Sequence, residues 1–185
     1  QAVIDGRLAW LKTQFATQTF PAAKVTANTT QLNTAGPDLA KLQGVHALTD
    51  ITGFGLAGHL LEMARGAKCT IQLNWDQVPL LPGVKHLAQQ GCITGASGRN
   101  WQGYGTEVNL PPQFETVDQS LLTDPQTSGG LLVACAPEEV PQVMAVFQQH
   151  GFDHAAVIGQ VCPASTHGLS VQRSGAARSE EHTSE

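Results

Sequence analysis

Apolar and polar residues follow two different spacings along this sequence, and these spacings predict which segments are strands and which are helices. Short apolar or alternating runs bounded by turn residues predict β-strands at residues 44–50, 69–75, 131–136, 155–162 and 168–172. Apolar residues at helical spacing predict α-helices within residues 3–16, 56–66, 78–91, 113–122 and 138–150. Because helices and strands are interleaved, we expect a layered α+β or α/β domain.

The helix expected at 56–66 has the clearest pattern of the five. Leu56, Leu60 and Met63 share an apolar face, and Gly66 is expected to end the helix. The opposite face is expected to be polar and carries His59, Glu62 and Arg65. This helix follows directly on the segment Asp50 to Gly55, which contains an acid, two glycines and a threonine.

Three further segments complete the expected organisation. Residues 92–113 carry many glycines and no periodicity, so we expect a long loop, which in a compact domain is usually functional or disordered. The polar residues 178–185 differ from the rest of the chain and are excluded from the fold. We therefore divide the chain into an N-terminal helix and connecting segment (1–44), a main domain (45–173) and a non-native or disordered tail (174–185).

Composition and charge exclude several classes of function. The chain of 185 residues is 41% hydrophobic and 14% charged, with a formal net charge of −5. A negative net charge gives no basic surface for nucleic acid or an anionic membrane, so we expect neither as a partner. The four cysteines (Cys69, Cys92, Cys135 and Cys162) form no CxxC pair. We expect reduced, packed thiols of a cytoplasmic protein at Cys69, Cys135 and Cys162, which lie in apolar, strand-like segments.

The strongest candidate site is the junction after the strand at 44–50. Asp50 ends that strand, and ligands of layered α/β sheets collect beyond the carboxyl ends of strands. A carboxylate there suits Mg²⁺, while Thr52, Gly53 and Gly55 would let the backbone and the helix N-terminus approach a phosphate. The alternative is an ordinary helix cap made by Asp50 or Thr52.

Two other segments are candidate anion sites. In the segment Asp124 to Gly130, the successive backbone N–H groups of Thr127, Ser128, Gly129 and Gly130 could form a concave anion nest; the alternative is a turn that starts the next strand. In the segment Gly98 to Gly105, Arg99 could pair with a phosphate, with Trp101 and Tyr104 packed over it. A mobile surface loop is the alternative there. The histidines show no metal-binding spacing, and we assign none as a ligand.

Taken together and in this order, these motifs resemble the C-terminal half of the selenophosphate synthetase (selenide, water dikinase) family. The resemblance rests on "ALTDITGFGLAGHLLEMARGA", "LPGVKHL", "GRNWQGYG", "DPQTSGGLLVA" and "VIGQV", and it covers roughly residues 1–173. It implies a layered α+β fold of the PurM (aminoimidazole ribonucleotide synthetase) C-terminal type. It also implies a homodimer that uses ATP, water, selenide and Mg²⁺ to make selenophosphate, AMP and phosphate.

The resemblance assigns one functional residue to this chain and several outside it. Asp50 matches the family's C-terminal-domain aspartate that helps to hold magnesium. The family's reactive cysteine or selenocysteine, its catalytic lysine and its other magnesium aspartates belong to an N-terminal half that this sequence does not contain. We therefore expect an N-terminally truncated fragment with no catalytic residue of its own. The alternatives are another PurM-like ATP user, of the thiamine-phosphate kinase or hydrogenase maturation type, and a dimerisation module without turnover.

Overall fold

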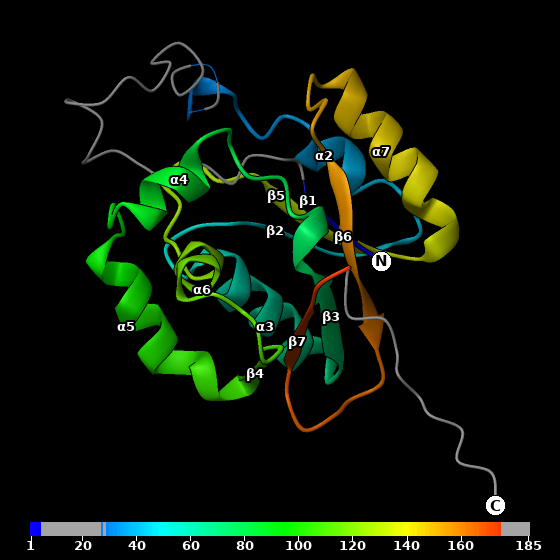
Figure 1. Cartoon of the computed structure of the whole chain (residues 1–185). Helices are drawn as coiled ribbons and strands as arrows, with labels where there is room; N and C mark the ends of the chain where they lie inside the picture. The colour runs from blue at the N-terminus through cyan, green and yellow to red at the C-terminus, as the bar shows by residue number, and fades with distance from the viewer. Residues whose placement is uncertain (5–26, 28, 175–185) are drawn as a thin grey trace, which may run out of the picture.

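A mixed β-sheet forms the centre of the computed structural model, which describes residues 1–4, 27 and 29–174 (Figure 1). Within these residues the strand order is β2-β5-β1-β6-β3-β7-β4. The strands are β1 (Ala2–Ile4), β2 (Val45–Asp50), β3 (Thr70–Asn74), β4 (Val108–Asn109), β5 (Leu131–Cys135), β6 (Ala156–Cys162) and β7 (Leu169–Gln172). Neighbours from β2 to β3 pair antiparallel, whereas β7 runs parallel to both β3 and β4.

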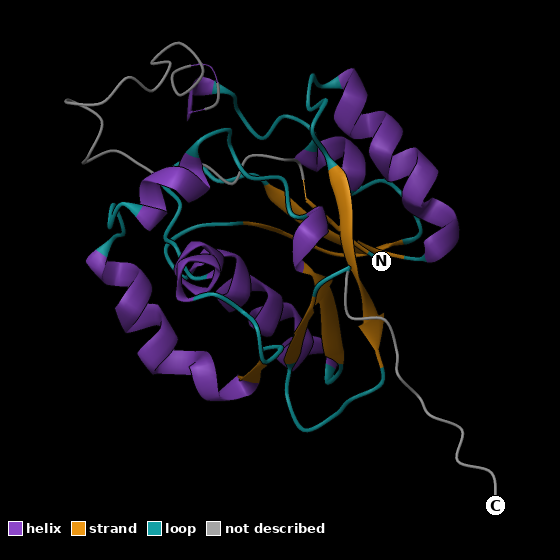
Figure 2. Ribbon diagram, viewed as in Figure 1, coloured by secondary structure: helices purple, strands orange, loops and turns teal. Residues whose placement is uncertain are grey.

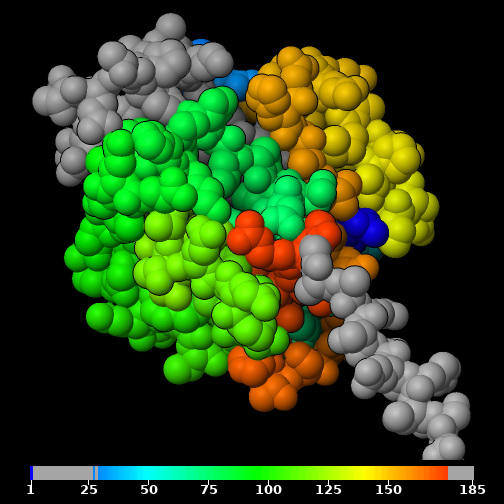
Figure 3. Space-filling model, in the orientation of Figure 1, coloured from blue at the N-terminus to red at the C-terminus, as the bar shows by residue number. Residues whose placement is uncertain are grey.

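Helices cover both faces of the sheet, which gives three layers (Figure 2). One side carries α2 (Gly36–Leu39) and α7 (Val140–Gln149), and the other carries α3 (Gly55–Ala67), α4 (Val84–Gln89), α5 (Gly95–Tyr104) and α6 (Thr116–Leu122). Single 3₁₀ turns lie at Trp75–Gln77, Gly105–Glu107 and Pro137–Glu139. In the space-filling view, the green helices α4–α6 and the yellow α7 occupy opposite sides, with the red β7 between them (Figure 3).

Strand β5 shows why the sheet must be covered on both faces. Leu131, Val133 and Cys135 pack into the core beneath α2 and α7, whereas Leu132 packs into the larger core beneath α3. Successive side chains of a strand point to opposite faces, so the uninterrupted apolar run "LLVAC" requires apolar cover on each side. The layered α+β fold expected from the sequence is confirmed.

Two elements differ from the sequence-based expectation. Residues Ala2–Ile4 form β1, paired with β5 and β6, rather than the start of a helix over 3–16; residues 5–16 lie outside the described part of the chain. The expected long loop at 92–113 contains α5, whose start is capped by the Thr94 hydroxyl, which accepts a hydrogen bond from Ser97 N (3.2 Å). A strand is favoured at Ala2–Ile4 because the facing edges of β5 and β6 would otherwise keep unpaired backbone N–H and C=O groups. In α5, the hydrogen bond made by the Thr94 cap outweighs the poor helix propensity of the glycines.

The end of α3 also differs from the expectation. Gly66 lies inside the helix, which continues to Ala67, and Lys68 adopts the left-handed conformation (φ 51°) that ends it. A left-handed residue at this position usually is glycine. The expected tail, at 174–185, lies outside the described residues except for Ser174.

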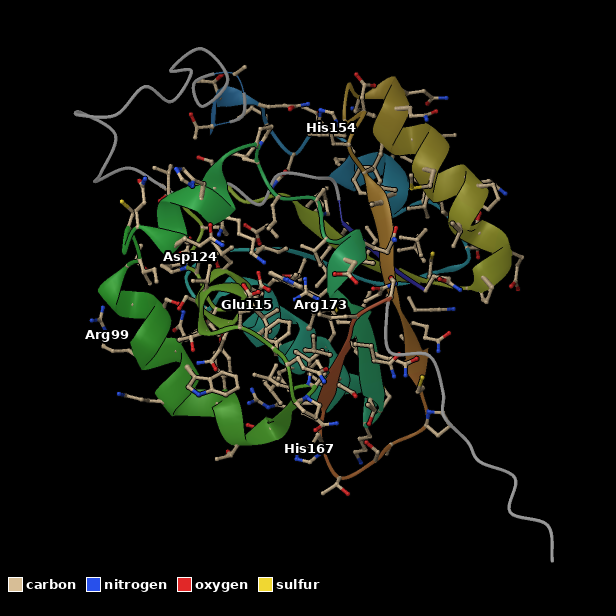
Figure 4. The ribbon with its side chains drawn as sticks, viewed as in Figure 1. Arg99, Glu115, Asp124, His154, His167 and Arg173 are labelled. Atoms are coloured by element: carbon tan, nitrogen blue, oxygen red, sulfur yellow. The ribbon has the colours of Figure 1, made fainter. Side chains whose placement is uncertain are left out.

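A buried ion-pair group holds α6 in place. The Asp118 carboxylate is fully buried and lies 3.0 Å from Lys85 Nζ and 3.1 Å from Arg173 Nη1. Lys85 also reaches Glu115, at 3.2 Å, and Figure 4 shows Glu115 and Arg173 near each other beside α6. Since a buried carboxylate without partners is strongly unfavourable, these contacts fix α6 against α4 and the end of β7.

The connection from α6 to β5 packs its backbone directly against the end of β2. Ile51 N donates a hydrogen bond to Gly130 O (3.0 Å), and Gln126 N donates one to Thr52 O (2.9 Å). An ideal Cβ placed on Gly129 would overlap the carbonyl oxygen of Ile51. The loop 124–130 can therefore approach this closely only with glycine at position 129.

Asp124 anchors the same loop from the inside. Its side chain is buried and accepts hydrogen bonds from Thr94 Oγ1 (3.0 Å) and Gln126 Nε2 (3.3 Å). Burial raises the pKa of the Asp124 carboxyl to about 7, although these two hydrogen bonds act in the opposite direction. One carboxyl group thus joins the loop to the N-terminus of α5.

We expect Gly129→Ala to destabilise the chain by more than about 2 kcal/mol, because the added methyl group has no space beside Ile51 O. Urea denaturation measures this change in the free energy of unfolding. Gly98→Ala is the control: Gly98 lies in α5 with no atom within 4 Å of an added Cβ, and alanine there should leave stability equal or higher. Equal stability of both variants would contradict the close packing.

We expect Asp124→Asn to change how stability depends on pH. Between about pH 4 and pH 7 the folded chain retains a proton on Asp124 that the unfolded chain has released, so the free energy of unfolding falls as the pH rises through this range. The fall is at most about 1.4 kcal/mol per pH unit. Subtracting the Asp124→Asn curve from the wild-type curve, both from urea titrations, isolates this contribution. Parallel curves would show that Asp124 ionises normally.

Candidate functional site

Asp50 lies at the carboxyl end of β2 with its side chain exposed to solvent. It is the last residue of the strand and pairs with Leu131, the first residue of β5. The helix-cap alternative fails, since Phe54 occupies the N-cap position of α3 and no side chain caps that helix. The carboxylate of Asp50 is therefore presented outward at the end of the sheet, as the sequence predicts.

The backbone between Asp50 and α3 makes a sharp turn that requires one glycine. Gly55 is left-handed (φ 69°), and an ideal Cβ there would lie 2.6 Å from the carbonyl carbon of Thr123. Gly53 differs, because a Cβ at that position would meet no atom within 4 Å. Crowding within the chain thus explains Gly55, whereas Gly53 leaves an open stretch of backbone beside Asp50.

Asn100 of α5 fixes this turn from the side. Its Nδ2 donates to Gly53 O and to Thr123 O, each at 2.9 Å. Tyr104 Oη donates to Phe54 O at 2.6 Å. The helix that the sequence pattern missed therefore holds the junction in position.

The loop 124–130 lies beside this junction through the backbone contacts to Ile51 and Thr52 described above. Thr127 is exposed and Ser128 is half-buried at its tip. The structure thus brings the residues of two predicted sites to one corner of the molecule: Asp50, Thr52, Gly53, Gly55, Thr127, Ser128, Gly129 and Gly130. Gly129 is required by its close packing against Ile51 O, whether or not an anion binds. The anion nest itself stays a prediction.

Arg99 lies elsewhere, on the outer side of α5 (Figure 4). It borders a groove of about 350 Å³ between α3 and α5, together with Phe54, whose side chain is 63% exposed. Tyr104 lines the same groove but is buried, with its hydroxyl donated to Phe54 O, and Trp101 packs against the core. A phosphate bound to Arg99 beneath these rings stays a prediction. On a helix, Trp101, two positions after Arg99, faces another direction.

Sequence reasoning missed one residue of the junction, His59. It was assigned to the polar face of α3, but its side chain is buried with only 6% exposed. Its Nε2 lies 3.0 Å from Thr52 N and 3.1 Å from Thr52 Oγ1, and its Nδ1 lies 3.1 Å from Glu62 Oε2. The only sign of this contact in the sequence is that His59 lies seven residues after Thr52. The contact itself depends on the left-handed turn at Gly55 between the two residues.

The donors at this corner suit a hard cation that is shared with a ligand. Asp50 supplies a carboxylate and Thr52 a hydroxyl, both exposed. Over the described part of the chain, no group of three or more His, Cys, Asp or Glu side chains is placed to hold a metal ion. Mg²⁺ typically binds one or two carboxylates and completes its shell with water and phosphate oxygens, so this donor set fits part of a magnesium site.

Among the helices of the described residues, none has the length and apolar character needed to cross a membrane.

Comparison with curated proteins gives close relatives over much of the chain. The chain is 58% identical over 139 residues to a selenide, water dikinase of Burkholderia orbicola, which is 75% of this chain and 39% of the relative. The corresponding protein of Dechloromonas aromatica is 56% identical over 133 residues, with 72% and 38% covered. The chain therefore spans about two fifths of the length of these relatives.

Comparison with solved structures supports the fold alone. A chain of the HypE–HypF complex gives a TM-score of 0.63 at 16% identity, covering 94% of this chain and 49% of that one. Thiamine-monophosphate kinase from Stenotrophomonas maltophilia gives a TM-score of 0.55 at 16% identity, covering 92% of this chain and 49% of that one.

A family model described as AIR synthase related protein, C-terminal domain, matches residues 12–172. The chain belongs to this family of AIR synthase related proteins and carries its C-terminal domain.

Proposed function

We propose that this chain is the C-terminal domain of a selenophosphate synthetase, an enzyme that makes selenophosphate from selenide, ATP and water and releases AMP and phosphate. The exposed carboxylate of Asp50 at the end of β2 carries the proposal, together with the 58% identity to selenide, water dikinases. Transfer of phosphoryl groups depends on positioning and charge neutralisation more than on covalent chemistry by the protein. A carboxylate that helps to hold Mg²⁺ beside the nucleotide supplies both.

In this proposal the corner described above faces a nucleotide that other parts of the parent protein help to bind. Asp50 would hold Mg²⁺ together with water and phosphate oxygens. The open backbone at Gly53 and the exposed Thr127 and Ser128 would lie along the phosphates. The parent would be a cytoplasmic homodimer, as the family resemblance implies.

A second candidate is another PurM-like ATP user. The likeness to HypE and to thiamine-monophosphate kinase supports it, but only at 16–21% identity. The two selenide, water dikinases described above are 56% and 58% identical in the matched region, and this difference favours the selenium enzyme.

Asp50→Asn should abolish most Mg²⁺-dependent activity without unfolding the protein. The test uses a chimera in which this chain replaces the matching residues of the full-length Burkholderia orbicola relative. Losing one well-placed electrostatic contact costs on the order of 3 kcal/mol, or about a hundredfold in AMP release. Asp153→Asn is the matched control, because Asp153 is an exposed carboxylate in the turn between α7 and β6. Unchanged activity and Mg²⁺ dependence of Asp50→Asn would refute the magnesium role.

The purified 185-residue chain should not release AMP from ATP and selenide on its own. It spans 39% of its relatives, and the one proposed cation ligand with a charge is Asp50. The assay compares the chain with the chimera at equal concentration by chromatography of the nucleotides. Turnover by the chain alone at a rate near that of the chimera would overturn the expectation.

A further inference from the structure

The imidazole of His59 lies between the exposed junction and a surface carboxylate. Nε2 is 3.0 Å from the backbone nitrogen of Thr52 and 3.1 Å from its hydroxyl, and Nδ1 is 3.1 Å from Glu62 Oε2. Thr52 and Glu62 are exposed, whereas His59 is buried. A hydroxyl, an imidazole and a carboxylate thus form a continuous hydrogen-bonded chain that begins two residues after Asp50.

The geometry assigns the proton of this histidine. A backbone N–H can only donate, so Nε2 must accept the hydrogen bond from Thr52 N and carries no proton. A neutral imidazole then has its proton on Nδ1, where it is donated to Glu62 Oε2. Glu62 therefore selects the Nδ1–H tautomer, which is the less common one in free histidine.

The tautomer in turn sets the direction of the Thr52 hydroxyl. Because Nε2 is an acceptor and Thr52 Oγ1 lies 3.1 Å from it, the hydroxyl donates its hydrogen bond to the same Nε2 lone pair that accepts from the backbone N–H of Thr52. The lone pairs of Thr52 Oγ1 then face away from His59, on the exposed side of the junction. A hydroxyl oxygen presented in this way is a ligand that Mg²⁺ accepts, as Ser/Thr does in P-loops.

We propose that Thr52 Oγ1 is a second protein oxygen for the cation–phosphate group that Asp50 binds, and that His59 and Glu62 are its positioning residues. This inference rests on the proposed function. Side chains that orient a metal ligand from behind typically change metal affinity by 10- to 100-fold when they are removed.

The first test is the tautomer of His59 in the 185-residue chain. Long-range ¹⁵N–¹H NMR of ring-labelled histidine at pH 8 distinguishes protonated from unprotonated ring nitrogens, and His59→Gln identifies the signal. We expect a protonated Nδ1 and an unprotonated Nε2. A protonated Nε2 would overturn the proposal, since the Thr52 hydroxyl would then accept a hydrogen bond from the ring instead of donating one.

The second test is the affinity of the chimera for Mn²⁺ with a non-hydrolysable ATP analogue, followed by the electron paramagnetic resonance signal of free Mn²⁺. Thr52→Val removes the hydroxyl at constant shape and should weaken binding about tenfold or more, while Thr52→Ser should retain it. His59→Gln keeps a hydrogen-bond acceptor near the Nε2 position, whereas His59→Asn does not, so His59→Gln should bind Mn²⁺ with the nucleotide analogue more tightly than His59→Asn. Thr106→Val, an exposed threonine before β4, is the control. The thermal midpoint of each variant checks folding.

These outcomes separate the inference from the function on which it rests. If Asp50→Asn weakens Mn²⁺–nucleotide binding but folded Thr52→Val binds like wild type, the role of Thr52 is refuted and the proposed function stands. If Asp50→Asn binds like wild type, the magnesium role of Asp50 in the proposed function fails, and the role of Thr52 at the same cation fails with it. A weakening by both Asp50→Asn and Thr52→Val, with rescue by Thr52→Ser, supports the inference.

Discussion

The close packing of two backbone segments determines the shape of the candidate site. The end of β2 and the loop 124–130 share two backbone hydrogen bonds, and Gly129 lies where any side chain would overlap Ile51 O. This approach sets where β5 begins, and hence where Asp50 ends β2. The site is therefore a consequence of how the main chain packs, and its polar side chains lie on a rigid support.

Several elements from one side of the sheet reinforce this packing. The N-terminus of α5 reaches the loop through Thr94 and Asp124, and the same helix reaches the junction through Asn100. The buried pairs of Asp118 hold α6, from which the loop departs. A ligand at the corner would thus meet groups that are already ordered, which lowers the entropic cost of binding.

The sequence predicts the parts of this molecule that depend on local pattern. The strand at 131–135 follows from a continuous apolar run and the strand at 45–50 from a short run around Val45, Ala47 and Leu48, and Asp50 follows from its place at a strand end. Helix α5 escaped the pattern because the polar Ser97 holds one of its buried positions and because Gly95, Gly98 and Gly103 lower its helix propensity. His59 escaped because its burial is produced by the left-handed turn at Gly55, which folds the junction back over the first turns of α3. The strand at Ala2–Ile4 depends on partners more than 120 residues away.

Whether Asp50 holds the cation is decided by a crystal structure of the chimera with Mn²⁺ and a non-hydrolysable ATP analogue, with the metal located by anomalous scattering. We predict Mn²⁺ at bonding distance from a carboxylate oxygen of Asp50, with nucleotide phosphates completing its shell. A metal bound entirely by other residues, with the Asp50 carboxylate in bulk solvent, would contradict it.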